Sequence, residues 1–201
     1  MPDVELLTRH FLGIYFLLIG LSYTSICLGL WRRSELSHIQ YGEKGSCTWW
    51  NRHIFNLFRA AILGVCVIRI FLPVDPWLGI ISPLYKAPVL LLGVAILLSA
   101  YSVIGYVHSY MREDWRSGID STKLKPLLIQ GPFARSRNPL FIGVILGQIG
   151  FFLALPSIFT LICLVVGVSV IIRQAHREED SLASVYGQQY LEYQRRVPRW
   201  L

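Results

Sequence analysis

A run of 33 consecutive uncharged residues, 140–172, constrains this chain more than any other feature. The only turn signal inside the run is Pro156-Ser157, which leaves apolar segments of 16 residues at 140–155 and 157–172. A membrane-spanning helix needs about 20 mostly apolar residues, with a lower limit of about 17. We therefore expect a tight hairpin of two short membrane helices. A re-entrant pair that does not cross is the alternative.

Three further apolar runs precede this hairpin, at residues 11–31, 54–72 and 87–107. The chain is 54% hydrophobic and only 15% charged, which is too apolar for a soluble domain with a polar shell. The first run follows Asp3 and Glu5 rather than a basic cluster, and no small-x-small cleavage site follows it, so we expect it to be retained. The sequence predicts an all-α integral membrane protein with five transmembrane helices in a single domain, 1–201.

Lys and Arg are distributed unevenly among the segments that connect these runs. Residues 32–53 hold four, residues 110–138 hold six and residues 173–201 hold five, whereas residues 73–86 hold one. The positive-inside rule then places the three basic segments and the C-terminus in the cytoplasm, and the N-terminus outside. The net charge of +7 is explained by this topology and by anionic lipid headgroups, so no nucleic-acid partner is indicated.

Isolated polar and sulfur-containing residues within the apolar runs suggest little chemistry. The four cysteines, Cys27, Cys47, Cys66 and Cys163, form no paired motif, so we expect neither a disulfide framework nor a metal site. We expect Arg69, near the outer end of its run, to extend to the headgroups. Arg59 lies one to two turns from the inner end of its run. Its side chain either extends to the headgroups as well or belongs to a functional site. Gly143 and Gly147 are spaced for close helix packing.

The two ends of the hairpin carry polar clusters that must meet at one mouth. Asn138 precedes Pro139 at a helix start, where it can cap the helix and where free N–H groups suit an anion. Glu178 and Glu179 follow the second apolar segment, either as part of an ion-pair cluster with nearby arginines or as a site for a cationic amino group. Residues 178–194 are expected to continue as a helix that Gly187 interrupts, and residues 110–130 to lie along the inner membrane interface.

These clusters match a family pattern. The residues that carry it are Gly131-Pro132-Phe133, Arg137-Asn138-Pro139-Leu140-Phe141-Ile142-Gly143, Glu178-Glu179-Asp180-Ser181-Leu182, Tyr186-Gly187, Tyr190, Tyr193 and Val197-Pro198-Arg199. Together, in this order and separated by one hairpin, they resemble the isoprenylcysteine carboxyl methyltransferase family, which is similar in turn to phospholipid N-methyltransferases. The resemblance covers roughly residue 115 to the C-terminus. It makes residues 110–201 the catalytic half and residues 1–109 the scaffold.

The resemblance implies S-adenosylmethionine as cofactor and a membrane-associated methyl acceptor. The positions implied for the cofactor are Leu127, Leu128, Gly131, Phe133, Arg137, Asn138, Pro139, Phe141 and Glu178. Arg173, Arg177 and Glu179 are the implied catalytic candidates, and Trp115 and Arg116 are assigned to the acceptor. The family most often has His at the position of Asn138 and Tyr at those of Phe133 and Phe141. Because Asn cannot shuttle protons, this chain fits a carboxylate or thiol acceptor better than an amine, although Glu178, Glu179 or His176 could act as a base.

Two other classes remain open from the sequence. A membrane reductase of the sterol-reductase type has a similar C-terminal hairpin but binds NADPH, which needs a more extended basic and aromatic pocket. A non-catalytic scaffold or small transporter is the other alternative, although few polar groups lie in the central parts of the spans. The lipophilic or lipidated acceptor is not identified by the sequence.

Overall fold

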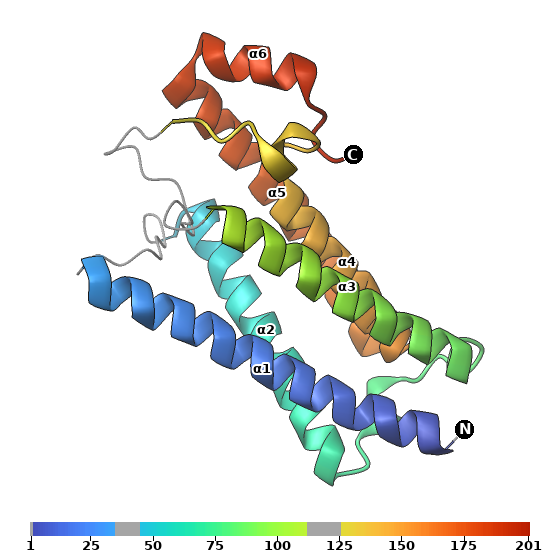
Figure 1. Cartoon of the computed structure of the whole chain (residues 1–201). Coiled ribbons are helices and arrows are strands. Elements are labelled where there is room, and N and C mark those ends of the chain that lie inside the picture. Colours follow the sequence, from blue (N-terminus) through green and yellow to red (C-terminus); the bar gives the residue numbers. More distant parts are fainter. Residues whose placement is uncertain (1, 35–44, 112–125) are drawn as a thin grey trace.

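The computed structural model describes residues 2–34, 45–111 and 126–201, and its elements are helices (Figure 1). In chain order they are α1 (Pro2–Ser34), α2 (Cys47–Phe71), the 3₁₀ helix η1 (Asp75–Leu78), α3 (Ala87–Met111), the 3₁₀ helix η3 (Gly131–Ala134), α4 (Pro139–Ala154), α5 (Ile158–Tyr186) and α6 (Gln188–Arg196). The long helices lie side by side as a bundle, and α6 folds across one end of it (Figure 1). We call this end the α6 end and the other the far end.

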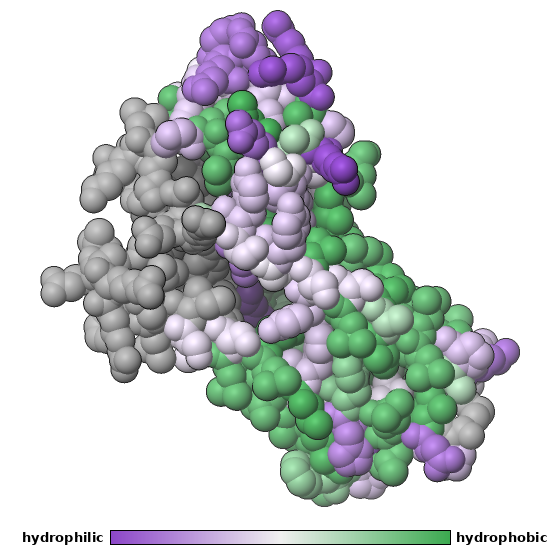
Figure 2. Space-filling model, in the orientation of Figure 1, coloured by the Kyte–Doolittle hydropathy of each residue, from purple (hydrophilic) through white to green (hydrophobic). Residues whose placement is uncertain are grey.

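Four of the helices, α1, α2, α3 and α5, are long and apolar enough to cross a membrane. The remaining apolar helix, α4, has 16 residues, which at 1.5 Å per residue is about 24 Å, against about 30 Å of hydrocarbon. On the face shown in Figure 2, apolar side chains cover much of the helical bundle, and hydrophilic ones gather over α6 and at the opposite end. The prediction of an all-α integral membrane protein is confirmed.

The turn between α4 and α5 reaches the far end of the bundle. Ser157 caps α5 through a reciprocal pair of hydrogen bonds with Thr160. The turn is also bonded to the α2–α3 loop, because Ile81 N–H donates to the Pro156 carbonyl and Ile158 N–H donates to the Gly79 carbonyl, both at 2.9 Å. The hairpin therefore connects the α6 end of the bundle with the α2–α3 loop at the far end.

Glycines let α3 and α4 approach closely. A Cβ atom on Gly93 of α3 would lie 2.2 Å from the backbone nitrogen of Ala154, and one on Gly143 of α4 would lie 2.7 Å from the Ile104 side chain. Gly147 is less tightly packed, with Ala100 at 3.8 Å. The predicted small-residue packing is therefore confirmed, and its partner is α3.

Arg69 does not extend to the headgroups, so that prediction is wrong. Its side chain is only 2% exposed, and its Nε donates to Asp75 Oδ1 at 2.5 Å. Asp75 also accepts from Arg9 Nη2 at 2.9 Å. A carboxylate within reach in the α2–α3 loop satisfies Arg69 inside the protein, and the ion pairs join α1, α2 and η1 at the far end.

Candidate functional site

The chain after α5 folds back onto the loop that leads into α4. Gly187, with a φ of 53°, ends α5 and allows α6 to turn across the α6 end of the bundle. Beyond α6 the backbone N–H of Arg137 donates to the Pro198 carbonyl at 3.0 Å, and Ser136 Oγ donates to the Arg199 carbonyl at 3.0 Å. Tyr193 Oη donates to the Phe133 carbonyl at 2.6 Å. The loop before α4 and the segment after α6 thus form one unit.

Glu179 lies at the centre of this unit and is 3% exposed. One carboxylate oxygen, Oε1, accepts from Asn138 Nδ2 at 2.8 Å and Arg199 Nε at 2.9 Å. The other, Oε2, accepts from Arg137 Nη2 at 2.8 Å, Arg199 Nη2 at 3.1 Å and Gln194 Nε2 at 3.4 Å. Both oxygens are therefore occupied by donors from the protein. We call Arg137, Asn138, Glu179, Gln194 and Arg199 the Glu179 cluster.

Asn138 stands at the N-cap position of α4, but its side chain makes no capping hydrogen bond, so the predicted capping role is wrong. Its amide turns instead to Glu179. A hydrogen bond to an ionised carboxylate is roughly twice as strong as one between neutral groups, which explains the preference. The backbone N–H of Asn138 is satisfied locally by Ser136 Oγ at 3.1 Å.

Glu178, one residue earlier on α5, faces a different direction. It is half-buried, and its Oε1 accepts from Gln174 Nε2 at 2.9 Å, one helical turn before it. Successive residues of an α-helix are about 100° apart, so Glu178 and Glu179 belong to different faces. Arg173 and Arg177, four residues apart, form a third row on α5, roughly opposite Glu179. The structure therefore brings Arg137, Asn138 and Glu179 together and leaves Arg173 and Arg177 away from that cluster.

The remaining predicted site residues lie around the start of α4. Gly131 has a φ of 59°, and a Cβ there would lie 2.4 Å from the Tyr110 ring, so only glycine fits. Phe133 lies next to the same ring, with centroids 6.4 Å apart. Leu127 packs against the aromatic cluster of α6, Leu128 and Phe141 are half-buried, and Pro139 is buried. Trp115 and Arg116 lie outside the residues that the structure describes.

The contacts of three polar residues at the site could not be predicted from the sequence: Gln194, Arg199 and His176. Arg199 Nη1 lies 2.6 Å from His176 Nε2, and His176 Nδ1 lies 2.7 Å from the Ile172 carbonyl. The neutral tautomer with hydrogen on Nδ1 satisfies both contacts. Arg199 belongs to the Val-Pro-Arg part of the motif, which was the available signal. Nothing in the sequence pattern singled out Gln194.

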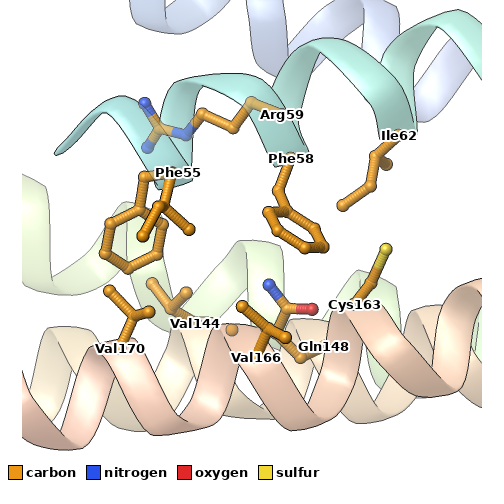
Figure 3. Close-up of a pocket in the computed structure, with 11 residues that line it drawn as sticks. Phe55, Phe58, Arg59, Ile62, Val144, Gln148, Cys163, Val166 and Val170 are labelled. Carbon is orange, nitrogen blue, oxygen red and sulfur yellow. The ribbon is translucent and has the colours of Figure 1, made fainter. Parts of the chain in front are cut away.

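A small cavity of about 80 Å³ lies between α2, α4 and α5 (Figure 3). Its lining is mostly apolar, with one amide and one cation: Ile54, Phe55, Phe58, Arg59, Ile62, Val144, Gln148, Cys163, Val166, Gly167 and Val170. Val144 lies one turn after Phe141, and Val170 lies two turns before Glu178. The nearest lining residues of the cavity are thus one to two helical turns from the mouth of the hairpin.

The model of the family described as phospholipid methyltransferase matches residues 85–189, just over half of the chain. This range includes α3, η3, α4 and α5, and therefore Asn138, Glu178 and Glu179. No curated protein and no solved structure matches the chain significantly.

Proposed function

Because the chain belongs to the phospholipid methyltransferase family, we propose that it transfers a methyl group from S-adenosylmethionine to an acceptor held in the membrane. The family match carries this proposal, since it covers the hairpin and both polar clusters at its mouth. The isoprenylcysteine-like pattern of the sequence favours a lipophilic or lipidated acceptor that carries a carboxylate or a thiol.

The residues at the mouth fit such a cofactor by their chemistry. Glu178 is a half-buried carboxylate that suits an ammonium or ribose hydroxyl groups. Arg173, which is exposed on the adjacent row of α5, suits a carboxylate. Phe133 and Phe141 offer apolar surface for a base. When bound, S-adenosylmethionine supplies an electrophilic methyl group on a sulfonium.

The Glu179 cluster positions these residues instead of exchanging protons. Both oxygens of Glu179 accept hydrogen bonds from guanidinium and amide groups, so this carboxylate is poorly placed to take a proton from an acceptor. Asn138 cannot act as a base, and the Nε2 of His176 faces Arg199. We therefore assign Glu179 a positioning role and Glu178 the contact with the cofactor.

This arrangement favours acceptors that are anionic near neutral pH. A carboxylate needs no deprotonation and a thiol needs a modest pKa shift, whereas an ammonium must lose a proton to a base within reach. Glu178 is the remaining candidate base for an amine. Alignment of donor and acceptor in a water-poor mouth supplies most of the acceleration in either case.

The proposal is tested by ligand-dependent thermal stability of the purified protein. S-adenosylmethionine and S-adenosylhomocysteine should raise the Tm in a concentration-dependent way, because they bind the folded state, and NADPH should not. Radiolabelled S-adenosylmethionine should then label an extractable acceptor in membranes. Stabilisation by NADPH alone would instead support the reductase class.

A further inference from the structure

The cavity between α2, α4 and α5 contains a polar group that the protein leaves unsatisfied. Gln148 Oε1 is buried and has no hydrogen-bond partner within residues 2–34, 45–111 and 126–201. Its amide lies against Gly167, where a Cβ would be 2.9 Å from Nε2, so the missing side chain at Gly167 makes the room. A buried amide oxygen without a partner is destabilising, and a ligand that donates a hydrogen bond to it removes that cost.

Residues of the cavity and of the candidate site lie on the same faces of α4 and α5. On α5, Gly167, Val170, Gln174 and Glu178 follow one another at spacings of three and four residues, so they share one face. On α4, Phe141, Val144 and Gln148 do the same. The cavity therefore lies below the residues assigned to the cofactor. Gln148 is seven residues beyond Phe141, or about 10 Å deeper along α4.

The lining indicates the chemistry of an occupant. Phe55, Phe58 and Val166 present apolar surface, and a volume of about 80 Å³ leaves room for part of one hydrocarbon chain rather than two. Arg59 lines the same cavity, and its guanidinium extends beside Phe55 toward the N-terminal end of α2, which is at the α6 end (Figure 3). Its charge favours an anionic group near the mouth.

We propose that this cavity binds the methyl acceptor as an amphiphile with one apolar chain, an anionic head at the mouth and a hydroxyl or N–H group about 10 Å down the chain that donates to Gln148. This inference rests on the proposed function and names the class of acceptor. Binding places part of the chain in the cavity between α2 and the α4–α5 hairpin and leaves the head beside the cofactor residues.

Two fatty acids test the hydrogen bond. Stearate and 10-hydroxystearate differ only in a hydroxyl at about the required distance, and each can compete with a photoactivatable stearate for crosslinking to the wild-type protein in detergent. In the wild type, 10-hydroxystearate should compete more strongly than stearate. This advantage should be about fivefold larger in the wild type than in Gln148→Leu, which is the effect expected of one hydrogen bond. The Gln148→Leu comparison also corrects for the weaker partitioning of the hydroxylated acid into detergent. An equal effect of the hydroxyl in both proteins would overturn the role of Gln148.

A pair of adjacent substitutions tests the position of the chain. Val166 lines the cavity, whereas Val165 is 58% exposed on the lipid-facing side of the same helix. Val166→Phe should reduce crosslinking of both fatty acids by tenfold or more, and Val165→Phe should not. Equal crosslinking in the two variants would exclude this cavity as the chain site. Binding of S-adenosylmethionine, followed by Tm in the same variants, should be unchanged, so failure here is distinct from failure of the proposed function.

Discussion

Asn138, at the start of α4, donates its side-chain amide to Glu179 of α5 at 2.8 Å, across 41 residues of sequence. The contact closes the base of a hairpin whose turn is bonded to the α2–α3 loop at the far end. Because two arginines share the same carboxylate, the loop before α4 and the segment after α6 depend on it as well. The polar geometry of the mouth is therefore fixed by one ionised group.

The neighbouring glutamates should separate stability from binding. Glu179→Gln removes the charge that pairs with Arg137 and Arg199 and should lower the free energy of unfolding by about 3 kcal/mol, because two partly buried guanidinium groups lose their charged partner. The matched change Glu178→Gln should leave the Tm near that of the wild type and weaken S-adenosylmethionine binding about tenfold. Thermal unfolding and ligand titration of both variants measure these effects. Wild-type affinity in a folded Glu178→Gln protein would remove the cofactor assignment.

Asn138→Ala should be milder than Glu179→Gln. It removes one charge-assisted hydrogen bond, worth about 1.5–3 kcal/mol, but leaves both guanidinium groups paired. We expect a lower Tm, a folded protein and a several-fold loss of S-adenosylmethionine affinity as the mouth loosens. If Asn138→Ala proved more destabilising than Glu179→Gln, the carboxylate would not be the centre of the cluster.

Packing of α3 against α4 is tested by two glycines on one helix. Gly93→Ala places a methyl group 2.2 Å from the Ala154 backbone and should destabilise the protein, with loss of the α3–α4 contact. Gly105→Ala meets no atom within 4 Å in the described structure and should be neutral or stabilising by up to about 1 kcal/mol through helix propensity. Denaturant or thermal unfolding in detergent compares them. Similar losses in both would indicate that the close approach is not required.

The far end should show acid sensitivity. Burial raises the pKa of Asp75. The hydrogen bonds and charges of Arg69 and Arg9 lower the pKa by more than burial raises it, so the pKa of Asp75 lies below its ordinary value. Asp75 therefore stabilises the folded state fully above the unfolded pKa of about 3.9, and this contribution is lost as the pH falls through the lower folded value. The Tm of the wild type should fall over that acid range, while Asp75→Asn should start lower and respond less. Parallel pH profiles would argue against this ion pair as a source of stability.

Orientation in the membrane can be tested with cysteines introduced at exposed positions. The Lys and Arg distribution predicts that the α2–α3 loop lies outside and α6 in the cytoplasm. An impermeant maleimide added from outside should label Pro76→Cys and miss Gln188→Cys until the membrane is opened. Cys27 and Cys47 are first replaced by serine, and the native Cys66 and Cys163 are buried, so they should contribute little background. The reverse labelling pattern would move the candidate site to the outer face.

Much of the helical framework could be predicted because the lengths and ends of the helices are marked by residues within or next to each helix. Apolar length gives the spans, Pro139 marks the start of α4, Pro156-Ser157 marks the turn, and Gly187 separates α5 from α6, as the structure has them. The spacing of Gly143 and Gly147 indicated close packing but not its partner, because one helix face does not specify which neighbour it meets.

The site was harder to predict because its contacts join residues that are distant in sequence. Glu178 and Glu179 are chemically identical. Which of them is buried and accepts from Arg199 depends on which face α5 turns toward the segment after α6. The same limitation explains Arg69: its partner Asp75 lies in a loop whose path no periodic pattern describes. The polar cluster was foreseen as a gathering of charges, but its pairing was not.

The short length of α4 has a consequence for the lipid around it. The hairpin turn is held at one end and the Glu179 cluster at the other, so α4 cannot lengthen, slide or tilt independently to match a thicker bilayer. With about 24 Å of helix against about 30 Å of hydrocarbon, we expect the lipid beside the hairpin to thin in order to match it. Headgroups of the nearer leaflet should then lie deeper beside the mouth than elsewhere in the membrane, which would shorten the distance that a polar head must travel to reach it.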